Sequence, residues 1–247
     1  MGKRYGNPPI TEAVCEFRFE PRSAWDLAIP GLVFEQLKGQ FPKRRSGKAL
    51  EVTIKAGPAG IQQQLVQTDH LQFLREDETM LVEVGPHRLG VSHFKPYSNW
   101  ESFLPIICQV LGAYRAVADP KGFARIGLRY KNRIDIAGDR VELEQYVDFY
   151  PFIGERLPQD FVTFLLGIEA PFEQGRDVLR LQITTAADRK PEAIPILIDL
   201  DYFLGRSGGV ALGDEVDWLN QAHDRIEAAF EGCIKEALRR QFEEVKS

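Results

Sequence analysis

Several sequence features that would indicate a function are scarce or absent in this chain. The three cysteines are widely spaced and form no C-x-x-C pair, which argues against a disulfide framework and against a structural zinc site. No P-loop and no G-x-G-x-x-G motif is present, so the simplest nucleotide-binding interpretations are removed. The cysteines are Cys15, Cys108 and Cys233, and we expect them to be buried, reduced thiols, because few and isolated cysteines usually are.

Long apolar runs are missing as well. No window approaches the roughly 20 consecutive apolar residues that a membrane helix needs. The opening residues, MGKRYGNPPI, are basic but lack the apolar stretch of a signal peptide. We therefore expect a cytoplasmic protein with no membrane partner.

The chain also lacks an excess of positive charge. Its 36 acidic and 31 basic residues give a formal net charge of −5. A global basic field that attracts nucleic acid is therefore excluded, and any such site must be local. The 247 residues, of which 44% are hydrophobic, can form a sizeable core in one large domain or in two small ones.

The clearest pattern that is present is the two-residue alternation of half-buried β-strands. In TEAVCEFRFE (11–20) the odd positions are mainly apolar and the even positions mainly charged. In FARIGLRYKNRIDI (123–136) the even positions form a core face. The odd positions of this second strand carry a row of four cations: Arg125, Arg129, Lys131 and Arg133.

Apolar residues at helical spacing predict three amphipathic helices. The first spans residues 31–41, and the second begins after Asn99 or Ser98 as its N-cap. The third is a long helix from about 214 to 244, with Asp214 as its N-cap.

Short strand-like runs fill much of the remaining chain. Five runs between residues 50 and 94 indicate an antiparallel meander, and three more precede the last helix, whereas 143–161 stays unassigned. The predicted fold class is α+β, with antiparallel sheets gripping long amphipathic helices in two related β-α-β(n)-α halves. The halves are residues 1–119 and 120–247, or they join into one continuous domain.

Three segments resemble a known family. They are YGNPPITEAVCEFRF near the start, RIGLRYKNRIDI in the middle and ILIDLDYF before the terminal helix. These segments are similar to a sporadically distributed bacterial family without an established activity. The resemblance implies no catalytic residue. The patchy occurrence of the family implies horizontally moved gene neighbourhoods, including defence systems.

The row of four cations has three interpretations. Carboxylates on neighbouring strands would pair with it, and candidates are Asp199 and Asp201 on one strand and Glu12, Glu16 and Glu20 on another. An arginine-lined groove would instead bind phosphate or an acidic peptide, because the guanidinium fork suits such anions. Simple solvation is the third interpretation.

A second basic cluster lies in PKRRSGK (42–48), which reads as a solvated loop. Its candidate binding residues are Lys43, Arg44 and Arg45. A contact with phosphate or nucleic acid is supported only if this loop lies near the row of four cations.

Catalytic patterns are weak. Asp199 and Asp201 share one face of ILIDLDYF, and two such carboxylates hold Mg²⁺ in nucleases, but a third ligand is needed, for which Glu169 is the nearest candidate. The G-R-S-G-G run around Ser207 matches a nucleophile elbow, yet that motif needs a parallel α/β sheet. A mobile glycine loop is the alternative.

Histidines offer no better site. His87 and His93 are six residues apart on one expected strand, too distant for one metal ion, and His70 stands alone in an expected turn.

The sequence favours a non-enzymatic binding or adaptor protein of a bacterial multi-gene system that recognises a protein partner and needs no cofactor. A metal-dependent phosphodiesterase or nuclease that uses Asp199 and Asp201 is one alternative. A binder of RNA or of an anionic ligand through Arg125, Arg129 and the rest of the cation row is the other.

Overall fold

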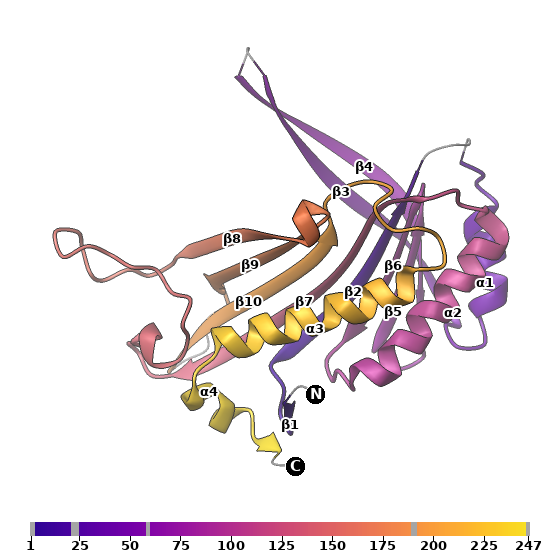
Figure 1. The fold of residues 1–247 in the computed structure, drawn as a ribbon. Helices are drawn as coiled ribbons and strands as arrows, with labels where there is room; N and C mark the ends of the chain where they lie inside the picture. The colour runs from indigo at the N-terminus through magenta and orange to yellow at the C-terminus, as the bar shows by residue number, and fades with distance from the viewer. Residues whose placement is uncertain (1–2, 21–24, 58–59, 189–191, 246–247) are drawn as a thin grey trace.

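A nine-stranded antiparallel sheet organises the described part of the molecule (Figure 1). The computed structural model describes residues 3–245 except 21–24, 58–59 and 189–191, and for 48–57 and 60–69 it describes only the backbone. The strand order is β3-β4-β5-β6-β2-β7-β10-β9-β8. The strands are β2 (Ile10–Phe19), β3 (Lys43–Gly57), β4 (Gly60–Leu74), β5 (Met80–Gly85), β6 (Arg88–Phe94), β7 (Phe123–Ala137), β8 (Leu165–Phe172), β9 (Asp177–Thr185) and β10 (Ala193–Leu204).

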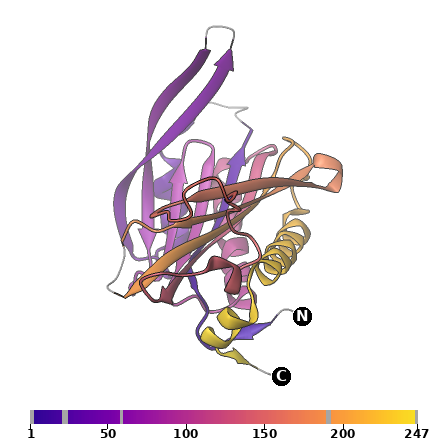
Figure 2. The ribbon, with the colours of Figure 1, turned by 90° about the vertical axis from the view of Figure 1, so that its left-hand side faces the viewer.

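Three helices lie on one face of this sheet: α1 (Ile29–Leu37), α2 (Trp100–Ala118) and α3 (Glu215–Cys233) (Figure 1, Figure 2). The side chain of Asn99 accepts a hydrogen bond from the Ser102 amide at 2.8 Å, which confirms Asn99 as the N-cap of α2. The opposite face of the sheet, defined by the side chains of Glu16, Arg125 and Asp201, is called the open face below.

The two halves of the chain follow a similar order of elements, but the second half has only a 3₁₀ turn where the first half has the helix α1, so the predicted order of strand, helix, strands and helix is met in the first half alone. β2 is followed by α1, by the strands β3 to β6 and by α2, and β7 is followed by β8 to β10 and by α3. β2 and β7 pair at the centre of the sheet, and the last strand of each half, β6 or β10, lies beside the first. This arrangement confirms the predicted α+β class. The sheet runs without a break across the boundary at 119–120, and the division into two domains stays a prediction.

The core lies between the helices and the sheet because the alternation of β2 and β7 directs every second side chain toward the helices. Phe17, Leu128 and Tyr202 have no exposed surface. Cys15 and Cys233 are buried and Cys108 is half-buried, and all three are free thiols. No helix in the described residues combines the length and the apolar character needed to cross a membrane.

The prediction of a loop at 42–48 is wrong, because the long strand β3 begins at Lys43, but Arg44 and Arg45 are solvent-exposed as predicted. β3 and β4 form a hairpin that projects beyond the rest of the sheet (Figure 2). Gly47 lies opposite His70 and lets the strands approach, since a Cβ at residue 47 would lie 2.3 Å from His70 Nε2. His70 is therefore inside β4 and not in a turn.

The predicted helix from 214 to 244 is also broken. α3 ends at Cys233, and a short helix, α4 (Glu236–Gln241), follows. Val147 forms a β-bridge with Ile234, and the amide of Lys235 donates to the Tyr146 carbonyl at 2.8 Å. These bonds hold residue 234 in an extended conformation and end the helix. The unassigned region 143–161 begins with one 3₁₀ turn, η1 (Leu143–Gln145).

The two ends of the chain are tied together. β1 (Arg4–Tyr5) pairs with β11 (Glu244–Val245) in a small antiparallel sheet. The hydroxyl of Tyr5 donates to Glu231 of α3 at 2.6 Å, which anchors this small sheet to the last long helix.

Candidate functional site: the open face

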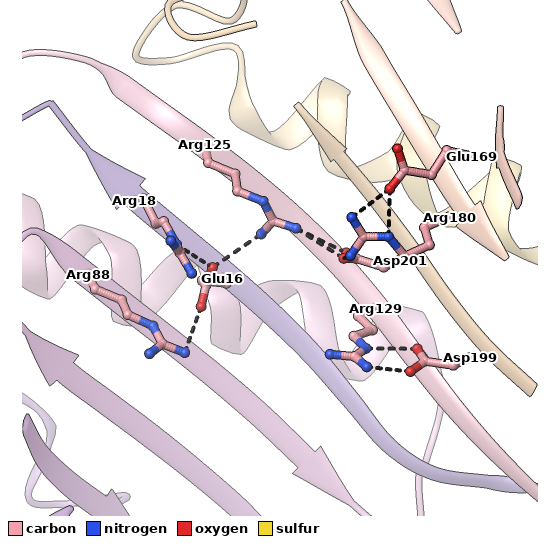
Figure 3. Close-up of polar contacts among 9 residues, drawn as sticks. All are labelled: Glu16, Arg18, Arg88, Arg125, Arg129, Glu169, Arg180, Asp199 and Asp201. Atoms are coloured by element: carbon pink, nitrogen blue, oxygen red, sulfur yellow. Dashed lines mark hydrogen bonds and ion pairs between the residues drawn. The ribbon is translucent and has the colours of Figure 1, made fainter. Parts of the chain in front are cut away.

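Alternating charges run across the open face (Figure 3). Glu16 of β2 is the centre of this row. Its carboxylate accepts hydrogen bonds from Arg18 Nε at 2.8 Å and from Arg125 Nη1 at 3.2 Å. Arg88 Nη2 of β6 lies 2.7 Å from its other oxygen. Three guanidinium groups from three neighbouring strands therefore converge on one carboxylate.

Glycines make room for these long side chains. Glu16 pairs with Gly90 on one side and with Gly127 on the other. A Cβ at residue 127 would lie 2.6 Å from Arg125 Nη1, so the guanidinium occupies the space that a side chain would fill.

The row continues to the far edge of the sheet. Arg125 Nη2 donates to Asp201 of β10 at 3.1 Å, and Arg180 Nη1 of β9 lies 4.0 Å from the same carboxylate. Arg180 in turn donates to Glu169 of β8 at 2.6 Å. Phe203 lies beneath both arginines, with Cζ–centroid distances of 4.7 and 5.3 Å. Charges of alternating sign thus connect six adjacent strands, from β6 to β8, and we call this set the charge ladder.

The other cations of β7 are paired too. Arg129 makes a two-bond contact with Asp199, in which Nε donates to Oδ1 at 2.7 Å and Nη2 donates to Oδ2. Lys131 Nζ donates to Glu12 at 2.5 Å. Arg133 bonds Asp188 at 2.6 and 2.7 Å and also bonds Asp135. Each of the four cations predicted from the sequence has a carboxylate partner.

Burial and charge act against each other on the carboxylates. Burial raises the pKa of Glu16, but the three neighbouring guanidinium groups outweigh it, and the pKa lies below its ordinary value. Burial dominates at Asp201 and holds its pKa above the ordinary value, although Arg125, Arg129 and Arg180 oppose the shift. The hydrogen bond to Asp199 raises the pKa of Arg129.

The second basic cluster does not join this row. Arg44 points to the helix face, where its guanidinium lies 5.4 Å from the centroid of the Phe34 ring. Lys43 bonds the carbonyl of Glu76, and Arg45 donates to Gln72 at 2.6 Å. β3 is five strand positions away from β7, which corresponds to roughly 24 Å at the usual spacing between strands.

The described residues give the other catalytic patterns little support. Asp199 and Asp201 face arginines, and Glu169 is paired with Arg180. The only described group of three side chains with metal-ligating geometry lies elsewhere, on α3: His223, Asp224 and Glu227. Asp224 of this group is exposed and Glu227 is half-buried, and acidic groups at a surface are common without a metal ion.

The residues around Ser207 and the histidines also do not form the sites that their sequence patterns resemble. Ser207 lies in a turn after an antiparallel strand, so the strand-to-helix elbow is not formed. His223 stacks on Trp100 with ring centroids 4.7 Å apart. His87 occupies the turn before β6, and His93 is buried near the other end of that strand.

Two clefts lie on the helix side and not on the open face. One, of about 270 Å³, separates α2 from α3 and is bordered by the ion pair of Arg115 with Glu215. The other, of about 320 Å³, lies beside Trp218 and Arg176. The open face is therefore not the mouth of either cleft.

Part of the charge ladder cannot be found from the sequence. Arg18, Arg88 and Arg180 all contribute guanidinium groups, yet only Arg18 lies on a strand whose alternation is regular. Arg88 opens a strand that is buried on both faces, and Arg180 belongs to a run without a clear charged face. Their shared position depends on the strand order, which periodicity does not reveal.

Comparisons with known proteins assign no family to this chain. No family model matches it, and no curated protein matches it. A solved structure, the di-domain ARO/CYC StfQ from the steffimycin biosynthetic pathway, aligns with 88% of this chain and 94% of its own at 8% identity and a TM-score of 0.19. A similarity this low carries no argument about fold or activity.

Proposed function

We propose that this protein is a non-enzymatic binding or adaptor protein that recognises a protein partner through the open face of its sheet. The observation that carries the proposal is the charge ladder: alternating, mutually neutralising charges on a face that the helices leave uncovered. Such a surface presents a fixed pattern of positive and negative groups to a partner, while its net electrostatic field is weak. Electrostatic patterning of this kind supplies specificity in protein recognition more than raw affinity.

The residue types support a protein partner. Arginine and aromatic side chains are enriched in the centres of protein interfaces. Arg125, Arg180 and Phe203 stack together in the ladder, and a guanidinium held by one carboxylate keeps further N–H donors for a partner. Intramolecular pairing also fixes these side chains in advance, which reduces the entropy lost on binding.

The same pairing weakens the two alternatives. A phosphate ligand would have to compete with carboxylates for Arg125, Arg129, Lys131 and Arg133. A nuclease built on Asp199 and Asp201 would need those carboxylates to hold a metal instead of arginines. For its context we keep the expectation from the sequence, a cytoplasmic protein of a bacterial multi-gene system, with defence as one such setting.

The test is affinity purification of the tagged full chain from its host in low and in high salt. We compare the wild type with Arg180→Ala on the ladder and with Arg140→Ala, which removes an arginine from an exposed pair with Asp160. We expect a stoichiometric protein that survives high salt with the wild type and with Arg140→Ala, and is lost with Arg180→Ala.

Two results would overturn the proposal. Nucleic acid that is released in high salt would make the open face an anion-binding surface, because phosphate contacts weaken steeply with salt. A protein partner that Arg180→Ala retains at wild-type level would place recognition away from the ladder.

A further inference from the structure

The two edges of the sheet differ in how they are protected. The described start of the edge strand β3 carries Lys43, Arg44 and Arg45, and cations of this kind discourage pairing with another chain. The other edge strand, β8, reads LLGIEAPF and contains no cation. Its side chains are largely exposed, including Leu165 at 70% and Ile168 at 49%. β8 has one charge, Glu169, which is paired with Arg180, and one proline, Pro171. The rest of this edge is uncharged and is a template for another strand.

The hydrogen bonds of β8 show which backbone groups face outward. The carbonyl of Phe164 accepts from the amide of Thr185, just before β8 pairs with β9. Because alternate residues of an antiparallel strand bond the same neighbour, the even-numbered residues of β8 bond β9. The N–H and C=O groups of Leu165, Gly167 and Glu169 then point away from the sheet. Pro171 falls in the same outward set, the position where a proline without an N–H is tolerated.

This edge is complementary to itself. When two copies of β8 run antiparallel about a two-fold axis at Ile168, Gly167 of each copy lies opposite Glu169 of the other, and these outward residues exchange hydrogen bonds. Leu165 lies opposite Pro171 and donates to its carbonyl. No two like charges meet, and Glu169 is already paired with Arg180 of its own chain. The half-exposed Ile168 side chains meet each other on the helix side.

We propose that this protein forms a homodimer in which β8 of one copy pairs with β8 of a second copy and extends the sheet across the two-fold axis. The occupant of the edge is a second copy because one register pairs every outward backbone group of residues 165–171 except the Leu165 carbonyl, which faces the proline. The same register covers the exposed Leu165 and Ile168 and leaves no repulsive pair. The dimer keeps both open faces on the same side of the extended sheet, away from the helices. The inference does not depend on the proposed partner of the open face.

The test uses the position at which a residue faces its own copy. The full chain is measured by size-exclusion chromatography with light scattering over a range of concentrations. We expect the wild type to be a dimer and Ile168→Lys to be a monomer, because the introduced lysines lie opposite each other. Leu32→Lys is the control: Leu32 is 52% exposed on α1, far from β8, and this variant should stay dimeric.

A mixture sharpens the test. Ile168→Lys and Ile168→Glu should each be monomeric alone and should form a mixed dimer when combined, since opposite charges then face each other across the axis. As a second variant, Ile168→Cys should form an intermolecular disulfide under oxidation, because residues in a non-hydrogen-bonded pair have close Cα atoms. A monomeric wild type, a dimeric Ile168→Lys, or a failure of both the mixture and the cysteine variant would overturn the inference.

Discussion

Neighbouring residues of β2 meet opposite environments. Phe17 faces the helices, has no exposed surface and packs against Phe123 with ring centroids 5.8 Å apart. Glu16, one position earlier, faces the open side among three arginines. The helix face is stabilised by apolar burial, whereas the open face keeps half-buried charges by neutralising them in place. A row of cations in the sequence is therefore no evidence of an anion-binding site by itself, because its partners lie on strands that are remote in the chain.

We expect the largest loss of stability from a substitution on the helix face. Phe17→Ala removes a fully buried ring and leaves a cavity between sheet and helices, so we expect a loss of about 3–5 kcal/mol in the free energy of unfolding. Chemical denaturation measures this change. A loss below about 0.5 kcal/mol, within the range of ordinary surface substitutions, would mean that the two faces do not differ as described.

We expect the next largest loss of stability from a substitution on the open face. Glu16→Gln preserves shape but leaves Arg18, Arg88 and Arg125 without their shared carboxylate, and we expect a loss of about 1–3 kcal/mol at neutral pH. Glu35→Gln, which removes the acid of an exposed helical pair with Lys38, is the control and should cost under about 0.5 kcal/mol.

The pH dependence of this difference has a definite sign. The pKa of Glu16 is lower in the folded protein than the usual unfolded value of about 4.3. Its contribution is fully present above that value and is lost as the pH falls through the folded-state pKa. The difference between wild type and Glu16→Gln should therefore shrink below about pH 4. A difference that stays constant from pH 7 to pH 3 would contradict the ionised ladder.

Much of the fold follows from local patterns. The alternation in β2 and β7 and the Asn99 cap depend on neighbouring residues alone, and the structure contains all three. In both halves of the chain a first strand is followed by several further strands and then by a long helix. This order also follows from patterns within short segments of the sequence. Cross-strand pairing of the β7 cations with Asp199, Asp201, Glu12 and Glu16 could be expected because these carboxylates share single faces of their own strands.

The remainder depends on contacts that are distant in sequence. PKRRSGK reads as a loop because its charges are adjacent, yet Gly47 and Arg45 fit the opposing residues of β4. The end of α3 at Cys233 is set by the bridge of Ile234 to Val147, more than 80 residues earlier. The ladder combines strands β6, β2, β7, β10, β9 and β8, an order that no periodicity contains.

The most direct test of the central claim is a double-mutant cycle between Arg129 and Asp199, whose two-bond contact represents the pairing of the whole cation row. The free energy of unfolding is measured for the wild type, Arg129→Ala, Asp199→Ala and the double variant. Because Arg129 is partly exposed, we expect a favourable coupling of about 0.5–1 kcal/mol. A coupling within about 0.3 kcal/mol of zero would contradict the claim, because the pair would then contribute nothing measurable to stability and would not hold Arg129 against a competing anion.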